Sequence, residues 1–383
     1  MIPYIAMMVL SCTCFYIAYN TKIDNELFRR IWILFGILIP CFLAAFRDVS
    51  VGTDVLSYVV KTVDYAETHS LKELIIRFTA PNIPEIEPLY LVVTFIISLF
   101  TNSISTHLFV IELVCVLFVY KTFKEIGFRN KMWFGFFIYY TLFYGFSLNL
   151  MRQVIVMCFL LWGLCFIKKR QYIRAVILCA ILMMIHRTGI IGFVVYALYP
   201  LITAQNIKNK VLQKLAEKNR ILFDGLLIIV SAVVVRFAGM LITIISALTG
   251  SFQYQALHVK SYFTIIPSHL IMMSIIILVS LIFIKSSARM NREIEYYCVL
   301  SILAVILWQV QGVSRESYRI ALYFWIFVLP YLVSIVGTIR KKSNAIIIEG
   351  IFCIIAFVYF YYFTVISGMN SIYPYTSTFL GIG

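Results

Sequence analysis

Residues 31–54 read IWILFGILIPCFLAAFRDVSVGTD, an apolar run of membrane length that ends abruptly in an arginine and an aspartate. Similar runs of about 18 to 25 residues recur along the chain, and each is long enough to cross roughly 30 Å of hydrocarbon as a helix. The 383-residue chain is 62% hydrophobic and only 13% charged, far from an ordinary globular composition. These features predict an all-α, polytopic integral membrane protein.

The net charge of +15 comes largely from basic residues in short clusters, a pattern that indicates sidedness rather than nucleic-acid binding. The clusters lie at 22–30, 121–131, 168–174, 208–220, 285–292 and 340–342. The positive-inside rule assigns them to the cytoplasm. About twelve transmembrane helices satisfy this rule, at 3–20, 30–46, 104–122, 132–148, 150–167, 173–186, 187–203, 221–248, 267–284, 294–312, 317–338 and 344–366. Both termini then face outward.

One apolar run, at 88–100, is left over by this assignment. If it crossed, the cluster at 121–131 would fall outside, so we expect a re-entrant or interfacial helix on the outer side. The chain is then a single transmembrane domain over 1–383. Its outer (periplasmic) segment with short helices covers 47–103, and a second outer loop covers 249–266.

Several arginines fall at outer helix ends, against the usual charge bias, so we expect them to have a function. They are Arg47, Arg152, Arg187, Arg315 and Arg319. Arg315 and Arg319 are spaced i and i+4 and project from one helix face. Two guanidinium groups placed in this way can clamp phosphate oxygens.

Three outer residues are candidates to accept a proton: His186, Asp54 and Glu87. Asp54 lies in the first turn of a helix expected from Thr53, which we expect to be its N-cap. A cationic site lowers the proton affinity of a base, which mildly favours a carboxylate over the histidine; otherwise the three alternatives stay open. Among outer aromatic residues, Tyr58 and Tyr318 are candidates to stack on sugar rings, although interfacial aromatic belts are common.

The sequence lacks a phosphate-binding glycine loop, a dinucleotide-binding fingerprint, an HExxH motif and a DxD-like metal pair. Its nine cysteines have no metal-ligand spacing. We therefore expect no metal and no cofactor. Any reaction must use a substrate that is already activated, and the arginines point to a phosphate or pyrophosphate presented at the outer face.

A set of short motifs resembles the EpsG-like branch of the Wzy-type polysaccharide polymerases over most of the chain. In order, the motifs are FRDVSVGTDVLSY (46–58), EPLY (87–90), NLMRQVIVM (149–157), KKRQYIR (168–174), IHRTGIIG (185–192), SRESYRIALYF (314–324) and YPY (373–375). Each motif is weak alone, whereas their order and spacing together are fairly specific.

The resemblance implies a GT-C-like glycosyltransferase of the bacterial inner (cytoplasmic) membrane. Such an enzyme polymerises O-antigen or capsule repeat units, carried on undecaprenyl pyrophosphate, at the periplasmic face. Its implied partners are these lipid-linked glycans, membrane lipids and a polysaccharide co-polymerase that regulates chain length, but no nucleic acid. By motif position, the five outer arginines would bind the pyrophosphate, and His186, Asp54 or Glu87 would be catalytic.

Three other functions compete with this interpretation. A flippase or transporter would line a central path with charge and show two pseudo-symmetric halves, whereas we find no internal repeat. An O-antigen ligase would carry its large outer loop late in the chain, whereas the longest outer segment here is early. An acyltransferase would need a cytosolic acyl-CoA entrance and a catalytic histidine within the membrane.

Overall fold

The computed structural model describes residues 1–22, 25–79, 86–203, 220–238, 240, 264–284, 292–313 and 317–383. Within these ranges the secondary structure is helical, apart from an isolated antiparallel bridge between Ser377 and Ile382. The predicted all-α class is therefore confirmed for the described residues. Contacts divide the chain into two compact units, 1–190 with 346–383, and 191–345. The single transmembrane domain stays a prediction.

Among the described residues, seven helices are long and apolar enough to cross a membrane, by length and composition. They are Ile2–Asn20, Glu26–Ala45, Ile104–Ile126, Met151–Lys168, Arg292–Gly312, Tyr318–Thr338 and Lys342–Ile366. These helices fit a multi-pass membrane protein. The twelve predicted spans include shorter helices; the predicted span 221–248 is described only up to residue 238 and at 240, where it contains α13, and most of the predicted outer loop 249–266 lies outside the described residues. The count of twelve therefore stays a prediction.

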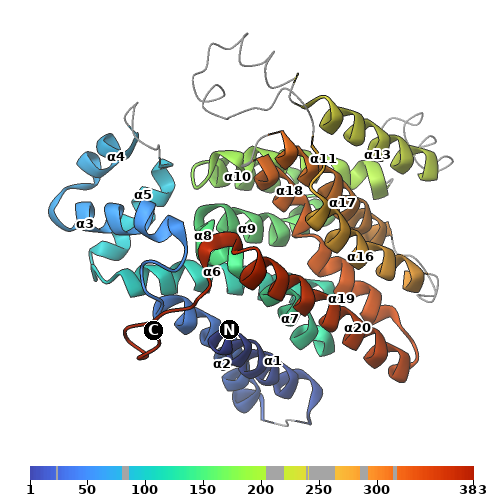
Figure 1. Cartoon of the computed structure of the whole chain (residues 1–383), viewed down its shortest axis with the longest axis horizontal. Helices are drawn as coiled ribbons and strands as arrows, with labels where there is room; N and C mark the ends of the chain where they lie inside the picture. The colour runs from blue at the N-terminus through green and yellow to red at the C-terminus, as the bar shows by residue number, and fades with distance from the viewer. Residues whose placement is uncertain are drawn as a thin grey trace. The chain divides into compact units, whose positions relative to one another are not determined.

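The first unit contains the N-terminal half of the chain and its C-terminal end (Figure 1). Its helices are α1 (Ile2–Asn20), α2 (Glu26–Ala45), η1 (Val55–Val60), α3 (Lys61–Thr68), α4 (Leu71–Thr79), α5 (Pro88–Ser98), α6 (Ile104–Ile126), η2 (Arg129–Lys131), α7 (Met132–Leu142), α8 (Tyr144–Asn149), α9 (Met151–Lys168), α10 (Tyr172–Met183), η3 (Arg187–Ile190), most of α20 (Lys342–Tyr361), η6 (Tyr362–Ile366) and η7 (Met369–Ser371). The long helices α1, α2, α6 and α9 pack in succession, and α3, α4 and α5 form a separate group of short helices.

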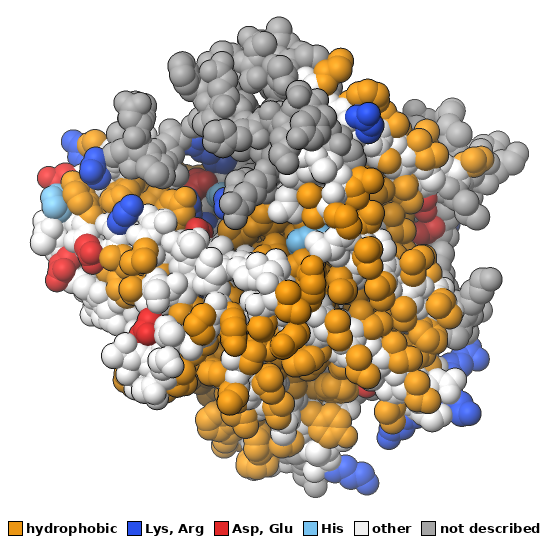
Figure 2. Space-filling model, in the orientation of Figure 1, with side chains coloured by type: hydrophobic (Ala, Val, Ile, Leu, Met, Phe, Trp, Pro, Cys, Tyr) orange, Lys and Arg blue, Asp and Glu red, His pale blue; other side chains and the backbone are white. Residues whose placement is uncertain are grey.

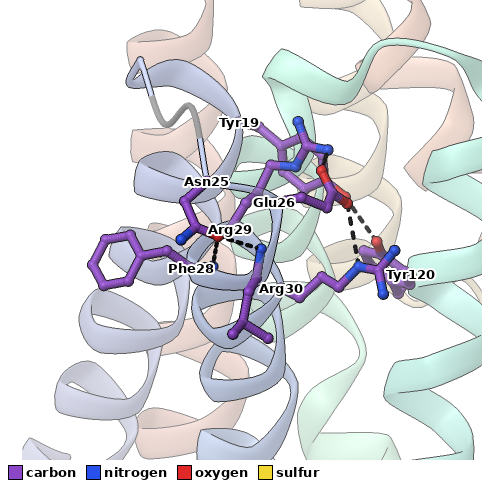
Figure 3. A network of polar contacts seen from close by, with 8 residues as sticks. Tyr19, Asn25, Glu26, Phe28, Arg29, Arg30 and Tyr120 are labelled. Atoms are coloured by element: carbon purple, nitrogen blue, oxygen red, sulfur yellow. Dashed lines mark hydrogen bonds and ion pairs between the residues drawn. The ribbon is translucent and has the colours of Figure 1, made fainter.

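Polar side chains form a small network at the start of α2 (Figure 3). Asn25 caps the helix by accepting two first-turn amide hydrogens, at 2.8 and 3.3 Å. Glu26 pairs with Arg29 and, at 3.3 Å, with Arg30. A carboxylate in the first turn complements the helix dipole, and pairs at this spacing stabilise a helix by about 0.3–0.5 kcal/mol each. Local charge thus organises part of the basic segment 22–30.

A buried ion pair joins the start of α7 to α20. Lys131 donates from Nζ to the Glu349 carboxylate, and only 14% of the lysine and 6% of the glutamate side chain is exposed. Removing one partner of such a pair leaves an uncompensated buried charge. This contact therefore fixes α20 against the N-terminal helices of the same unit.

The span predicted at 132–148 is not one straight helix. The chain leaves the helical conformation at Phe143, where φ is −128°, and again at Leu150, between α8 and α9. In an uninterrupted helix the Leu148 carbonyl would accept from the amide of Arg152. Here it accepts instead from Arg47 Nη2, at 2.9 Å. Arg47 thus satisfies a carbonyl that the α8–α9 break leaves without its helical partner.

The C-terminal tail folds back onto the segment that follows α2. The amide of Asp48 donates to the Thr376 carbonyl (3.0 Å), and Asp48 Oδ1 accepts from the amide and hydroxyl of Thr378 (2.8 and 2.9 Å). Tyr375, in the late YPY motif, donates to the Leu43 carbonyl at 2.9 Å. The hydrogen bonds from Thr378 lower the pKa of Asp48. The C-terminal tail therefore holds in place the segment after α2, residues 46–54, which is called the Arg47 segment below.

The second unit is built around one central helix. Its helices are α11 (Ile191–Thr203), α13 (Arg220–Arg236), α16 (Pro267–Ile284), α17 (Arg292–Trp308), η4 (Gln309–Gly312), α18 (Tyr318–Trp325) and α19 (Val328–Thr338). α17 contacts α11, α13, α16, α18 and α19. Its Tyr296 is fully buried and donates to the Val195 carbonyl of α11 at 2.8 Å.

Gly52 marks the closest approach of the Arg47 segment to the end of α8. Its φ is +89°, and a Cβ at this position would lie 2.5 Å from the Leu148 carbonyl oxygen. We expect Gly52→Ala to lower the free energy of unfolding, because alanine meets both the left-handed conformation and this clash. Denaturant unfolding of the detergent-solubilised protein measures the effect.

Gly127 provides a matched control, because its φ is +91° but a Cβ there would meet nothing within 4 Å. The left-handed conformation alone costs about 1–2 kcal/mol, and overpacking adds about 1–3 kcal/mol. We therefore expect Gly52→Ala to exceed Gly127→Ala by about 1–3 kcal/mol. Equal losses would contradict the close approach.

Candidate functional site

Glu87 is placed by the proline that follows it. Residues before proline favour extended backbone, and proline is well suited to the first position of a helix. Glu87 accordingly has φ −68° and ψ 142°, and α5 starts at Pro88. The amide of Leu89 donates to the Met184 carbonyl at 2.9 Å, which fixes the start of α5 beside the end of α10. The Glu87 side chain is thereby held inside the unit, with 6% of the residue exposed.

Arg152 enters the same site from the second position of α9. A cation in the first turn of a helix is opposed by the helix dipole, so helix stability does not explain its position. Arg152 is 8% exposed, and its Nη1 donates to Glu87 Oε2. The carboxylate of Glu87 therefore compensates the buried charge of Arg152.

His186 and Arg187 reach Glu87 from the turn after α10. His186 Nδ1 lies 2.9 Å from Glu87 Oε1, and the amide of Arg187 donates to the same oxygen at 3.0 Å. Gly189 lets this turn fold tightly back, because a Cβ there would lie 3.2 Å from the Leu182 carbonyl. Residues 186–189, HRTG, thus supply two hydrogen-bond donors to Glu87 and the glycine that lets the turn pack closely enough to orient them.

These contacts define the Glu87 cluster: Glu87, Arg152, His186 and the Arg187 amide. Burial alone would raise the pKa of Glu87, but the hydrogen bond from His186 and the charge of Arg152 outweigh it. The pKa of Glu87 is therefore lowered, and the carboxylate is ionised at neutral pH. An ionised carboxylate only accepts hydrogen bonds, so the proton of the shared bond must sit on His186 Nδ1.

Two tyrosines lie against the guanidinium group of Arg152. Its central carbon is 4.2 Å from the ring centroid of Tyr58 and 5.7 Å from that of Tyr90. Tyr58 lies in η1, a π-helix over 55–60, within the helix predicted to start at Thr53. Cation–π contacts at such distances add about 0.5–2 kcal/mol. Tyr58 therefore belongs to the site, through Arg152.

Asn149 is a site residue that the sequence did not single out. Its Oδ1 accepts from the Thr53 hydroxyl (2.9 Å) and from the amide of Asp54 (3.3 Å). The predicted N-cap role of Thr53 is wrong, because its hydroxyl donates to Asn149 rather than accepting from its own helix. Asp54 is half-buried, and its charge acts on Tyr90. The sequence signal for Asn149 is its polar side chain three residues before Arg152, at the start of a predicted span.

Arg47 lies beneath the site rather than at its surface. It is 5% exposed, and its Nη2 also lies 3.6 Å from the sulfur of Met151. Burial lowers the pKa of Arg47 from its usual value. The guanidinium group of Arg47 is therefore buried against the backbone, and its predicted contact with the pyrophosphate stays a prediction. Arg47 supports the α8–α9 break from which Arg152 projects.

The remaining predicted residues fall in the second unit or outside the description. Tyr318 is buried, and its ring lies 5.2 Å from that of Trp308. Arg319 lies in α18, and Arg315 is outside the described residues. The expected clamp formed by these two arginines stays a prediction.

The Glu87 cluster can hold a proton acceptor in a fixed orientation. Because Glu87 binds Nδ1–H of His186, the neutral form of this imidazole has its lone pair on the second ring nitrogen, Nε2. The His186 side chain is 17% exposed. Within the described ranges, no group of three or more His, Cys, Asp or Glu side chains is arranged to hold a metal ion. The arrangement suits a general base that is oriented by a carboxylate.

We expect Glu87→Gln to destabilise the protein by about 3–5 kcal/mol, because it leaves the buried Arg152 charge uncompensated. Thermal unfolding in detergent measures this loss. Glu67→Gln, at an exposed position of α3, is the control and should stay within about 0.5 kcal/mol. A loss at Glu87 no larger than that at Glu67 would contradict the buried ion pair.

The same contacts predict a pH dependence of stability. A carboxyl whose pKa is lowered by folding contributes fully above its unfolded pKa, about 4.3 for glutamate. The contribution is lost as the pH falls through the lowered value in the folded protein. The stability difference between the native chain and Glu87→Gln should therefore be constant from pH 7 to about 5 and shrink below about 4. Unfolding curves at several pH values check this.

Comparison with known proteins places these residues in a family. The family model described as the EpsG family matches residues 30–377, which is more than half of the chain and includes every residue of the Glu87 cluster. No curated protein and no solved structure matches. The chain therefore belongs to the EpsG family.

Proposed function

We propose that the protein is a polysaccharide polymerase. It joins oligosaccharide repeat units of O-antigen or capsule, carried on undecaprenyl pyrophosphate, at the periplasmic face of the bacterial inner membrane. In this proposal the chain is a GT-C-like glycosyltransferase with about twelve spans, and both termini are periplasmic. The observation that carries the proposal is the Glu87 cluster, which holds His186 as an oriented base in a member of the EpsG family.

The reaction assigns a role to each group of the cluster. His186 Nε2 accepts the proton of an acceptor sugar hydroxyl, and the hydroxyl oxygen forms a bond to the anomeric carbon of the donor glycan. The bond between that carbon and the pyrophosphate oxygen breaks, and its electron pair leaves with the pyrophosphate. Glu87 keeps the imidazole in the required tautomer and stabilises the imidazolium that forms, as in other carboxylate–histidine pairs.

The leaving pyrophosphate needs positive charge, which arginine supplies without a metal. Arg187 is exposed at the turn that contributes its amide to Glu87, so it is our first candidate for this contact. Arg152 acts mainly on Glu87, and Arg47 supports the backbone from which Arg152 projects. Arg315 and Arg319, by their i and i+4 spacing in the sequence, are further candidates to bind phosphate. Tyr58 is half-buried and is our candidate to stack on a sugar ring, and the amide of Asp54 helps to position the segment that carries Tyr58 by donating to Asn149.

The proposal includes the partners expected of a polymerase. The substrate enters from the membrane, because its polyprenyl chain stays in the lipid while the glycan reaches the outer segment. A separate co-polymerase would set chain length.

The lipopolysaccharide or capsule ladder of a cell that lacks this gene, complemented with variants, tests the polymerase. We expect Arg152→Ala to abolish the ladder and to leave a single repeat unit on the acceptor. His186→Ala should lower the polymerisation rate about 10²- to 10⁴-fold, the usual contribution of a general base. Arg129→Ala, which removes an exposed arginine after α6, is the matched control and should keep the ladder.

The pattern of repeat units separates polymerase from its rivals. Loss of every repeat unit from the acceptor, with no single unit remaining, would indicate a ligase or flippase. A normal ladder with His186→Ala, from protein present at the native level, would overturn the assignment of the base.

A further inference from the structure

A cleft of about 490 Å³ lies between α3 and α4, apart from the Glu87 cluster. Pockets that hold small ligands usually measure about 300–1,000 Å³. Figure 2 shows charged side chains of both signs over α3 and α4, at the left of the view, on a face that is otherwise largely hydrophobic. The proposed reaction assigns no role to this cleft.

One wall of the cleft is aromatic. The ring of Tyr65 stacks on His69 with centroids 3.7 Å apart and planes at 11°, and it meets the Phe78 ring edge-on at 5.7 Å. His69 Nδ1 lies 3.0 Å from the Tyr65 carbonyl and 2.9 Å from the hydroxyl of Thr68. Phe78 is buried, with 8% exposed. These contacts give a wall that is fixed before any ligand arrives.

The other groups at the cleft are charged. Lys61 and Arg77 are exposed and form no ion pair with the described part of the chain. Glu73 stands four residues before Arg77, but its Oε2 accepts from the amide and hydroxyl of Ser70, at 2.8 and 2.7 Å. Asp64 is the one carboxylate among the residues that line the cleft. The lining therefore carries two cations, one anion and a histidine.

This combination matches the chemistry of an acidic sugar chain. An arginine can bind a carboxylate through two parallel hydrogen bonds, and a lysine adds a point charge. Asp64 can accept hydrogen bonds from sugar hydroxyls. An anionic lipid headgroup would use the cations but would have no need of the aromatic wall or of Asp64. The lining thus favours a glycan over a lipid.

The cleft shares structural elements with the Glu87 cluster. The amide of Ile86, the residue before Glu87, donates to the Phe78 carbonyl at 2.9 Å. α3 and α4 both contact α5, and α3 continues directly from the η1 helix that carries Tyr58. A glycan bound between α3 and α4 is therefore held by the same short helices that hold the proposed reaction site.

We propose that the cleft between α3 and α4 binds a segment of an acidic glycan, through Lys61 and Arg77 and against the Tyr65 wall. This inference rests on the proposed polymerase function and adds a substrate class to it: repeat units that carry uronic acid or another anionic sugar. The cleft is a binding subsite, so its loss changes affinity rather than the chemistry at His186.

Direct binding to the full-length protein in detergent tests the subsite. Calorimetric titration with a short oligogalacturonate, which carries a carboxylate on every ring, is compared with a neutral malto-oligosaccharide of equal length. We expect binding of the acidic probe only, weakening as salt is added. Lys61→Ala combined with Arg77→Ala should weaken this binding at least tenfold, since each charged hydrogen bond is worth about that factor. Both side chains are exposed, so the variant should keep its elution volume in gel filtration.

Lys72→Ala is the matched control, because Lys72 is exposed on α4 but does not line the cleft. It should leave the affinity within twofold, whereas Arg77→Ala alone should lower it about tenfold. Equal effects of Lys72→Ala and Arg77→Ala would mean a diffuse positive field, and would overturn the subsite. So would equal binding of the neutral probe, or no binding of the acidic one. A normal ladder with Arg152→Ala and His186→Ala would reject the polymerase but not oligogalacturonate binding, so the two failures are distinguishable.

Discussion

A buried, ionised carboxylate is the constraint on which the site depends. Glu87 accepts from Arg152, His186 and the Arg187 amide, and these donors come from α9 and from the turn after α10. An ionised carboxylate can be buried only when such donors replace water. The start of α5, the start of α9 and the turn after α10 must therefore meet at one point. Few sequences satisfy this requirement, because each donor has to arrive at a helix end.

The second requirement is that α9 begins where Arg152 can reach Glu87. The break before α9 would leave the Leu148 carbonyl unsatisfied, and Arg47 satisfies it. Gly52 permits the segment to approach the same carbonyl, and Asn149 binds the segment one residue further along. The C-terminal tail then closes over Asp48. The segments that carry the motifs at 46–58, 149–157 and 373–375 therefore pack together in one place, although they are far apart in the sequence.

Hydrophobic runs and basic clusters predicted the helical class and the positions of most long helices, because both signals are local. The resemblance also singled out Glu87, Arg152 and His186 as candidate site residues. It could not show that they touch, since 65 residues separate Glu87 from Arg152 and 99 separate it from His186. The boundary between α8 and α9 agrees with the predicted spans 132–148 and 150–167, whereas the break at Phe143 and the π-helix around Tyr58 were not predicted. The burial of Arg47 was also missed, because an arginine after an apolar span resembles one that reaches the interface.

The geometry bears on which residue serves as the base. The sequence alone mildly favours a carboxylate as the base, because its cationic residues would lower the proton affinity of a histidine. Glu87, however, is committed to donors that lower its pKa, and a weaker base is a poorer proton acceptor. The same contacts hold Nδ1 of His186 on Glu87, so that the neutral imidazole offers Nε2 as the proton acceptor. A carboxylate that is too weak to take the proton itself is well suited to stabilise an imidazolium beside it. In the proposed reaction the neighbouring cations therefore lower the pKa of Glu87 and keep it ionised. Glu87 in turn stabilises the imidazolium of His186, so that His186 can accept a proton although Arg152 and Arg187 are close by.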